Sequence, residues 1–282
     1  MLNDPVWLEV ALNGGAGLAF QPNIPITPEA IIAEGVACAK AGAAIIHLHV
    51  YDDDGKPFEN ADRYSQIIEG IRDQCDAIIY PTLGLGVELH ERLEPIKVLA
   101  QRGLLEWGVV DPGSVNITHI SQIAAKADGF LYANSDADIR ALLVLAASDN
   151  WRPAYAIYEP GFARLGKAMA DSIEGLRSPI YRVMFSDGLL FGMEPSAAAV
   201  QFYAQHLANV APDAQWMISG LDADIQGIMP LAIELGAHIR VGLEDAPFGC
   251  SQSNLEMVEQ AANTIINSGK SLATAQEVRR SG

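Results

Sequence analysis

Short apolar runs alternate along the chain with longer segments in which apolar residues recur at helical spacing. The short runs are apolar at successive positions, which is typical of parallel strands that are covered by helices on both faces. Eight runs predict strands: residues 6–12, 43–50, 77–83, 105–111, 153–159, 180–187, 215–220 and 238–244.

The longer segments carry the signals of helix ends. Residues 28–41 follow Thr27, a residue type that caps helices, and they begin with Pro28 and Glu29, which are favourable in a first turn. The other predicted helices are 61–74, 88–101, 195–209, 222–235 and a last one at 253–268. Eight strand–helix units in roughly 250 residues are the size of a (β/α)8 barrel. No Pro/Ser-rich linker interrupts them, so we expect a single (β/α)8 TIM-barrel domain over residues 1–282.

One segment offers an alternative fold. The sequence GFLYAN, residues 129–134, is also strand-like and lies between the fourth and fifth predicted strands. We interpret it as a short extra strand or part of a long loop. If it belonged to the core, the chain would have nine strands, and a doubly wound sheet would become the better interpretation.

Two histidines end the second predicted strand. His47 and His49 lie two positions apart, so their side chains share one face of the strand and can bind one zinc-like ion. Arg240 and Glu244 share a face of the last strand, which in a barrel closes beside the first and so approaches the second. Two His and one carboxylate leave a coordination position open, as catalytic sites do. The alternative is a pair of hydrogen-bonded histidines and an Arg240–Glu244 ion pair, with Asp245 as a cap.

Polar and glycine residues follow most of the predicted strands. Each one singly is a turn signal, but together they line one rim of a barrel, where active sites lie. We predict a substrate-binding set of Asn13, Gly84, Ser114, Asn116 and Glu106. The remaining histidines, His90, His119, His206 and His238, are predicted to be structural or at the surface.

Composition restricts the partners. The chain has 18 Lys and Arg against 35 Asp and Glu, a net charge of −17, which disfavours binding to nucleic acid or to an anionic membrane surface. No apolar run is long enough to span a bilayer, and the first residues do not form a secretory signal. The 3 cysteines lack CxxC spacing, so we expect a reducing, cytoplasmic setting.

Several motifs together resemble a known family, the β-keto acid cleavage enzymes. The resemblance covers nearly the whole chain, and its most specific parts are the HLHV run at 47–50 and GLED at 242–245. The supporting motifs are ALNGG (11–15), YPTLGLG (80–86), DPGSVN (111–116) and IYEPGFARLG (157–166). The family often has an arginine where this chain has Tyr51.

The resemblance implies a zinc-dependent (β/α)8 enzyme that forms a homo-oligomer, a dimer or tetramer. It implies that a β-keto acid and acetyl-CoA yield acetoacetate and a new acyl-CoA. It also implies roles for individual residues: His47, His49 and Glu244 as zinc ligands, Asp245 beside Arg240 as the base, Glu159 as the acid after the fifth strand, and Thr82 as a hydroxyl that assists coenzyme A transfer.

Two other functions stay open at this point. A metal-dependent barrel lyase or aldolase that needs no coenzyme A also combines an HxH pair with carboxylates. A catalytically silent barrel that only binds metal would have the same ligands.

Overall fold

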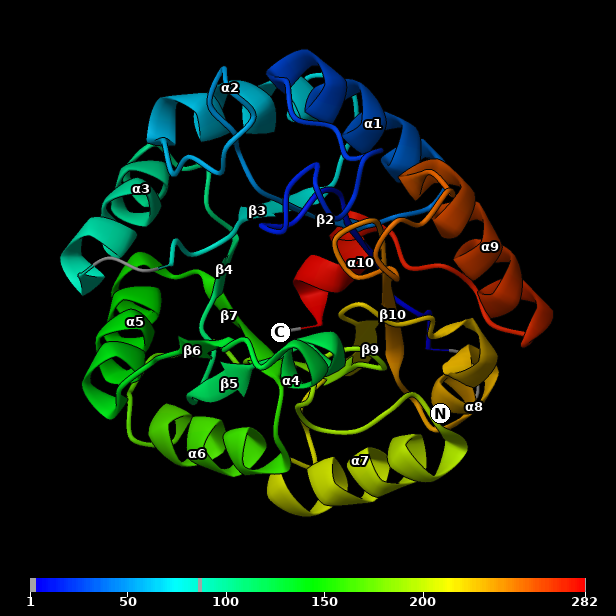
Figure 1. Cartoon of the computed structure of the whole chain (residues 1–282). Coiled ribbons are helices and arrows are strands. Elements are labelled where there is room, and N and C mark those ends of the chain that lie inside the picture. Colours follow the sequence, from blue (N-terminus) through cyan, green and yellow to red (C-terminus); the bar gives the residue numbers. More distant parts are fainter. Residues whose placement is uncertain (1–3, 86–87, 282) are drawn as a thin grey trace.

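Eight parallel strands form a nearly closed barrel in this computed structural model, which describes residues 4–85 and 88–281. The hydrogen-bonded order is β3-β2-β1-β10-β9-β8-β7-β4, and Figure 1 shows the ring with its helices outside. The described residues form no ladder between β3 and β4, although these two strands lie next to each other. The strands are β1 (Leu8–Ala11), β2 (Ile45–Leu48), β3 (Ile78–Pro81), β4 (Trp107–Val109), β7 (Arg152–Ile157), β8 (Ile180–Phe185), β9 (Trp216–Gly220) and β10 (His238–Val241). The predicted (β/α)8 barrel and all eight of its strands are confirmed.

Helices cover the outside of the barrel because each has one apolar face that packs on the strands. The first begins as its sequence predicts: Thr27 Oγ1 accepts a hydrogen bond from the Ala30 N–H, and Pro28 is the first helical residue. The outer helices are α1 (Pro28–Lys40), α2 (Ala61–Arg72), α3 (Leu89–Gln101), α5 (Asp136–Asp149), α6 (Pro160–Ala170), α7 (Ala197–Val210), the 3-10 turn η1 (Gln226–Ile228) with α8 (Met229–Glu234), and α9 (Asn254–Asn267). Within the described ranges, no helix is long and apolar enough to cross a membrane.

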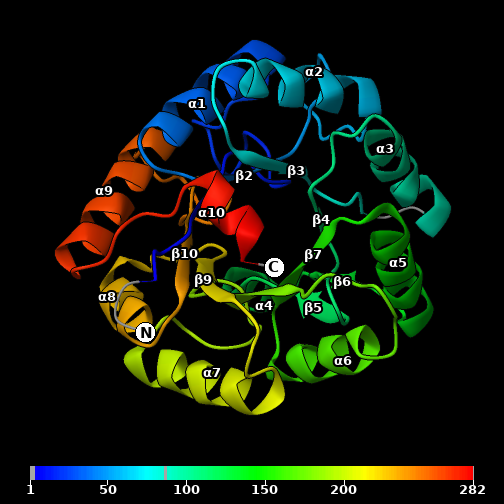
Figure 2. The ribbon, with the colours of Figure 1, turned by 180° about the vertical axis from the view of Figure 1, so that it is seen from behind.

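The two mouths of the barrel are covered differently. A short last helix, α10 (Ala275–Arg280), lies across the amino-terminal ends of the strands, as the view from behind shows (Figure 2). Its Arg279 guanidinium donates to the Ala77 carbonyl and to the Glu106 carboxylate, which flank β3 and β4. The loops that follow the strands leave the opposite, carboxyl-terminal mouth hollow.

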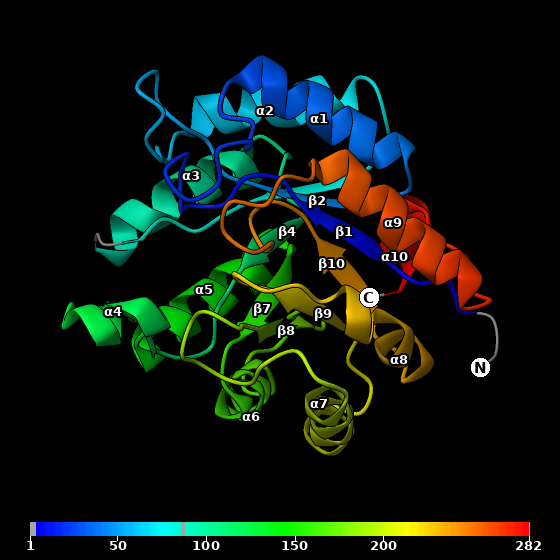
Figure 3. The same cartoon turned by 45° about the vertical axis from the view of Figure 1, so that its right-hand side comes forward.

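The extra strand-like segment is real but lies outside the barrel. Strand β6 (Phe130–Tyr132) pairs antiparallel with β5 (Val115–Ile117), and α4 (Ile120–Ala125) lies between them in the chain. Phe130 and Leu131 are exposed, so this ribbon does not contribute a strand to the core. Figure 3 shows α4 set apart from the barrel strands. The doubly wound alternative is therefore wrong.

Candidate active site

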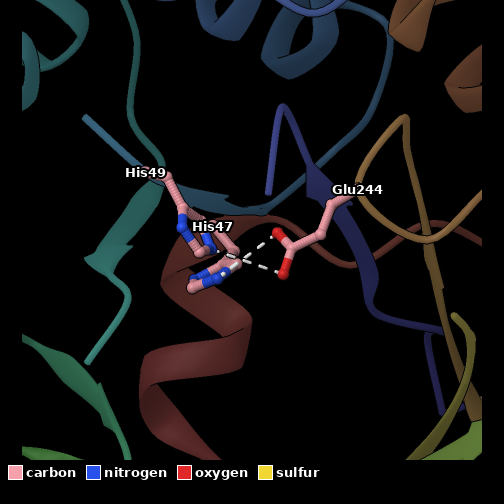
Figure 4. A group of neighbouring side chains, drawn as sticks. All are labelled: His47, His49 and Glu244. Atoms are coloured by element: carbon pink, nitrogen blue, oxygen red, sulfur yellow. Dashed lines mark ion pairs between the residues drawn. The ribbon is translucent and has the colours of Figure 1, made fainter. Parts of the chain in front are cut away.

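Three side chains converge at the carboxyl-terminal mouth. Strand β1 lies between β2 and β10, and its Ala11 pairs with His47, which brings the ends of β2 and β10 together. Glu244 Oε2 lies 3.4 Å from His47 Nε2, and Glu244 Oε1 lies 3.5 Å from His49 Nε2. Figure 4 shows both imidazoles facing the carboxylate. One ligand atom from each residue falls within 4.8 Å of the others, which is close enough to share one ion.

The residues present fit a divalent cation. His49 Nε2 and Glu244 Oε2 are buried and have no hydrogen-bond partner among the described residues. Buried polar atoms almost always have a partner, so atoms that converge without one indicate a missing ligand. Imidazole nitrogens and a carboxylate oxygen are the donors that zinc takes at sites with an open position.

The protonation states also suit a cation. Burial lowers the pKa of His47 to about 4, against the opposing pull of Glu244, so its imidazole is neutral at pH 7. Burial alone would raise the pKa of Glu244, but the Arg240 guanidinium 3.2 Å away outweighs it and holds that pKa well below its usual range. A neutral imidazole and an ionised carboxylate can both donate a lone pair to a metal.

A tight glycine turn supports Glu244. Gly14 has φ of +66°, and a Cβ at this position would lie 2.6 Å from Glu244 Cγ, so only glycine leaves room for the carboxylate stem. The buried Tyr51 hydroxyl donates to the Gly14 carbonyl. The tyrosine that replaces the family's frequent arginine therefore braces the turn against which Glu244 packs.

Asn13 fixes His49 rather than facing the cavity. Its Oδ1 accepts from the His49 N–H at 2.9 Å, and its Nδ2 donates to the carbonyls of Pro25 and His49 at 2.9 and 3.0 Å. The side chain is buried, and these backbone contacts use its hydrogen-bonding groups. The structure does not bring Asn13 to the cavity wall, because its buried amide is bonded to backbone groups that include those of His49, and substrate binding by Asn13 stays a prediction.

Arg240 connects the metal triad to the barrel interior. Its Nη2 lies 3.2 Å from Glu244 Oε1 and 2.8 Å from Asp245 Oδ1, and its Nη1 lies 2.9 Å from Glu9 Oε1. Asp245 Oδ2 accepts from Arg240 Nε at 2.8 Å and from Ser219 Oγ at 2.6 Å. Arg240 reaches the wall of the mouth cavity, whereas Asp245 lies behind it. The carboxylate predicted as a base is thus held against a guanidinium.

A second buried arginine extends the network. Arg182 Nη1 donates to the Tyr80 hydroxyl at 3.1 Å, and that hydroxyl donates to Glu9 Oε1 at 2.5 Å. Arg182 Nη2 also lies 3.8 Å from Asp111 Oδ1. The linked charges are the carboxylates of Glu9, Asp111, Glu244 and Asp245 and the guanidiniums of Arg182 and Arg240. When all are ionised, two negative charges remain in excess, and one divalent cation would balance them.

A cavity of about 810 Å³ opens above the network. His47, His49 and Glu244 lie in its wall together with Thr82 and Gly84. Apolar side chains line much of the remainder, among them Leu83, Met184, Leu189 and Phe248. A cavity of this size is within the usual range of small-molecule binding sites.

Comparison with known proteins shows the family to which this chain belongs. The sequence model of the beta-keto acid cleavage enzymes matches residues 5–281. The chain belongs to the β-keto acid cleavage enzyme family. It is 29% identical to a 3-keto-5-aminohexanoate cleavage enzyme of Fusobacterium nucleatum, over 92% of this chain and 90% of that protein. It is 26% identical to a 3-oxoadipate:acetyl-CoA acetyltransferase of Cupriavidus necator, over 99% of this chain and 94% of that protein.

A solved structure supports the fold of this family member. The complex of ObcA with oxaloacetate superposes with a TM-score of 0.69 at 18% identity, over 92% of this chain and 67% of that chain. At that identity the likeness concerns the barrel alone.

Two predicted site residues of this family member lie in the loop wall of the cavity. Thr82 is half-buried there, and its backbone N–H donates to the Leu48 carbonyl at 3.2 Å. At Gly84, a Cβ would lie 2.9 Å from Glu59 Cγ, so this glycine leaves room for a carboxylate that also faces the cavity. Burial raises the pKa of Glu59. Gly86, the last residue of the same motif, lies outside the described residues.

Three other predicted residues lie outside the cavity wall. Ser114 Oγ donates to the Asn134 carbonyl at 3.0 Å and accepts from the Asn134 N–H at 2.9 Å. Asn116 is exposed on β5. Glu159 is the N-cap residue of α6 and accepts from the Gly192 N–H at 3.0 Å. The structure does not bring these three side chains to the cavity wall, because the β5–β6 ribbon and α6 use them for local structure, and their functional roles stay predictions.

Glu106 lies at the opposite end of the barrel. It precedes β4 and forms ion pairs with Arg72 at 3.0 Å and with Arg279 at 2.5 Å. A residue before a strand lies at the amino-terminal mouth, so the structure does not bring Glu106 to the cavity, and its role in substrate binding stays a prediction.

Sequence reasoning missed several residues of the site. Glu9 and Arg182 stand as single charges inside otherwise apolar strands, which is a usable signal, since a charge at such a position is expensive without a partner. His119 was predicted to be structural or at the surface, yet it lines the cavity. It lies there because the segment from β5 through α4 to β6, residues 115–132, folds over the carboxyl-terminal mouth.

Proposed function

We propose that this protein is a metal-dependent β-keto acid cleavage enzyme that uses acetyl-CoA. A β-keto acid and acetyl-CoA would give acetoacetate and a new acyl-CoA. The observation that carries the proposal is the convergence of His47, His49 and Glu244, with unpartnered buried atoms, on a cavity beside Arg240. The relative from Cupriavidus necator is by name a 3-oxoadipate:acetyl-CoA acetyltransferase, which supports acetyl-CoA as the cosubstrate.

The metal would be zinc, held by His47, His49 and Glu244. Bound there, it would polarise the keto oxygen of the acid and lower the cost of an enolate. Arg240 would orient the substrate carboxylate from the cavity wall, and Asp245, with Ser219 behind it, would hold Arg240 in place.

We assign proton abstraction to Glu59 instead of Asp245. Glu59 lies in the cavity wall, and its Oε2 accepts from the Tyr64 hydroxyl at 2.8 Å. Asp245 has both oxygens on Arg240 and does not reach the cavity wall. A base must reach the proton that it takes, so the carboxylate that faces the cavity is the better candidate. Thr82, in the same wall, stays a proposal for assisting coenzyme A transfer.

An acetyl-CoA-dependent screen of β-keto acids, scored for acetoacetate, tests the function. We expect acetoacetate only when both substrates are present. Turnover of a keto acid without acetyl-CoA would favour the lyase or aldolase alternative. Tight metal binding with no product from any keto acid would favour the silent barrel.

The roles of the two carboxylates can be separated by matched amide variants. Glu59→Gln should lower kcat by roughly 10²-fold or more while metal content stays unchanged, since a positioned base contributes about that much. Asp245→Asn would place an amide against Arg240 and should lower stability together with activity. If Glu59→Gln keeps full kcat, the assignment of the base is wrong.

A further inference from the structure

A serine, a histidine and an aspartate lie in a row at the rim of the cavity: the serine is hydrogen-bonded to the histidine, and the other ring nitrogen of the histidine lies within ion-pair distance of the aspartate. Ser121 Oγ lies 2.6 Å from His119 Nδ1, and His119 Nε2 lies 3.4 Å from Asp222 Oδ2. Ser121 and His119 lie in the wall of the same cavity as the metal triad. His119 and Ser121 come from the start of α4, and Asp222 comes from the loop after β9.

The backbone around Ser121, His119 and Asp222 fixes their relative positions. Asp222 has φ of +54°, a left-handed conformation that costs free energy in a residue other than glycine. Its Oδ1 accepts from the Phe248 N–H at 2.8 Å, which fixes the carboxylate. At Gly188, a Cβ would lie 2.1 Å from Asp222 Oδ2 and 2.7 Å from His119 Nε2, so a larger residue would separate the two groups.

Two backbone hydrogen bonds join the start of α4 to the loop after β8. The Ile120 N–H donates to the Gly188 carbonyl at 2.9 Å, and the Leu190 N–H donates to the Thr118 carbonyl at 2.9 Å. His119 lies between these two hydrogen bonds and is therefore held over the cavity by the loop after β8.

Helix capping explains only part of this geometry. His119 is the N-cap of α4, and its Nδ1 can accept from the Ser121 N–H at 3.2 Å. Serine, threonine, aspartate and asparagine are the usual residues for that task. A cap needs no carboxylate at the other ring nitrogen, no strained Asp222 and no glycine at position 188. The contact with Asp222 is what a proton-transfer histidine needs, because a carboxylate orients the ring and stabilises its protonated form.

We propose that Ser121, His119 and Asp222 form a proton relay for the thiol of coenzyme A. This inference rests on the proposed function. In the imidazolium form, Nε2–H faces Asp222 and Nδ1–H donates to Ser121 Oγ, which leaves the serine hydroxyl proton free to point into the cavity. Because His119 and Ser121 line the same cavity as the metal triad, the relay faces the space in which a thioester would be bound.

The proton balance closes over the two halves of the reaction. In the first half, the enolate carbon of the keto acid attacks the acetyl carbonyl carbon, a C–C bond forms, and the C–S bond breaks with its electron pair on sulfur. Ser121 gives its proton to the sulfur and takes the Nδ1 proton of His119. In the second half, the thiol returns that proton to the relay while its sulfur attacks the original keto carbon. The C–C bond to that carbon breaks, the new thioester leaves as acyl-CoA, and the acetoacetate enolate recovers the proton held by the base.

The variant His119→Asn tests the relay. Asparagine still caps α4 but cannot pass a proton. His90→Asn is the matched control, because His90 is exposed on α3. We expect His119→Asn to lower kcat with acetyl-CoA by roughly 10²-fold, with unchanged metal content and unchanged KM for acetyl-CoA. His90→Asn should match the wild type.

An acetyl thioester of an acidic aryl thiol sharpens the test. Its thiolate leaves without a proton, so the single-turnover release of aryl thiolate should differ between His119→Asn and wild type by about threefold or less, against roughly 10²-fold with acetyl-CoA. An equal loss with both thioesters, a rise in KM alone, or full kcat in His119→Asn would overturn the relay. Absence of acetoacetate in wild type and His90→Asn alike would overturn the proposed function and the relay with it.

Asp222→Asn separates the charge from the fold. Asparagine tolerates the left-handed conformation and keeps an acceptor for the Phe248 N–H. A relay predicts a loss of about tenfold or more in kcat, since the ring loses the carboxylate that orients it and stabilises its protonated form. Thermal unfolding should show that the variant stays folded. Unchanged kcat would show that the carboxylate serves structure alone.

Discussion

The two ends of this barrel use the same residue types in opposite ways. At the amino-terminal end, His238 Nδ1 accepts from the Trp7 N–H at 3.1 Å, and Nε2 lies 2.8 Å from Gln215 Oε1. At the carboxyl-terminal end, His49 Nε2 is buried without a partner within the described part of the chain. Glu106 binds two arginines at one end, whereas Glu244 Oε2 is left open at the other.

The difference separates stability from function. At the amino-terminal end both ring nitrogens of His238 and both carboxylate oxygens of Glu106 have partners, and His238 also stacks on Trp7 with ring centroids 4.2 Å apart. At the carboxyl-terminal end Arg240 pairs with Glu244 Oε1, whereas Glu244 Oε2 and His49 Nε2 have no partner among the described residues. Active sites of this fold lie at the carboxyl-terminal end, which agrees with this division.

Removing a carboxylate from each end should give the largest contrast. Glu244→Ala should lose metal and lower kcat by on the order of 10³-fold or more, because the ligand set is incomplete. Glu106→Ala should keep the metal and kcat but unfold at lower urea concentration. Elemental analysis, steady-state kinetics and urea titration of both variants measure this. Equal metal loss in both would remove the distinction between the ends.

Replacing Arg240 tests the network that joins the interior to the site. Arg240→Met leaves the buried carboxylates of Glu9 and Asp245 without their cation and should destabilise the fold by about 3–5 kcal/mol. Urea unfolding measures the change. Lys97→Met, on the outer helix α3, should have little effect. A loss below about 1 kcal/mol for Arg240→Met would show that the interior charges are not held as described.

Gly14→Ala tests the turn behind Glu244. The new Cβ would approach Glu244 Cγ and would occupy a left-handed conformation, so the ligand must shift. Metal affinity should fall by roughly 10–100-fold, the usual effect of disturbing the support of a ligand. Competition with a chelator measures the affinity, and Gly17→Ala, with similar φ but open space around it, is the control for backbone strain. If both variants lose affinity equally, steric contact with Glu244 is not the cause.

The smallest effect concerns acid stability and His238. Burial, with a contribution from Arg152, lowers the pKa of His238 to about 3. Its contribution to stability is complete above the ordinary histidine pKa of about 6.5 and is lost as pH falls from there, because the unfolded chain takes up a proton that the folded one does not. The slope from this group is at most about 1.4 kcal/mol per pH unit. His238→Gln should flatten the pH dependence of unfolding between pH 6 and about 4; an unchanged slope would contradict the assignment.

The barrel could be predicted because apolar runs that are buried on both faces leave a strong pattern. The pair His47 and His49 could be predicted for a related reason, since alternation along a strand places them together. The prediction of Glu244 as the third ligand followed from closure of the barrel, which brings β10 beside β1.

The remaining features depend on contacts that leave no local pattern. Asn13 and Ser114 are polar residues that follow predicted strands, as binding residues often do. Their partners are backbone groups that only the folded chain brings near. The pairing of His119 with Asp222 joins segments that are far apart in sequence. Helix α6 was missed because Glu159-Pro160-Gly161 is also a turn signal, although Pro160 is its first helical residue.

Reversible removal of metal tests the central claim most directly. The wild-type protein should contain close to one divalent ion per chain, and chelation should abolish acetoacetate formation from a β-keto acid and acetyl-CoA. Zinc added back should restore the rate, and the Glu244→Ala variant should not respond. Full turnover by the metal-free wild-type protein would contradict the account.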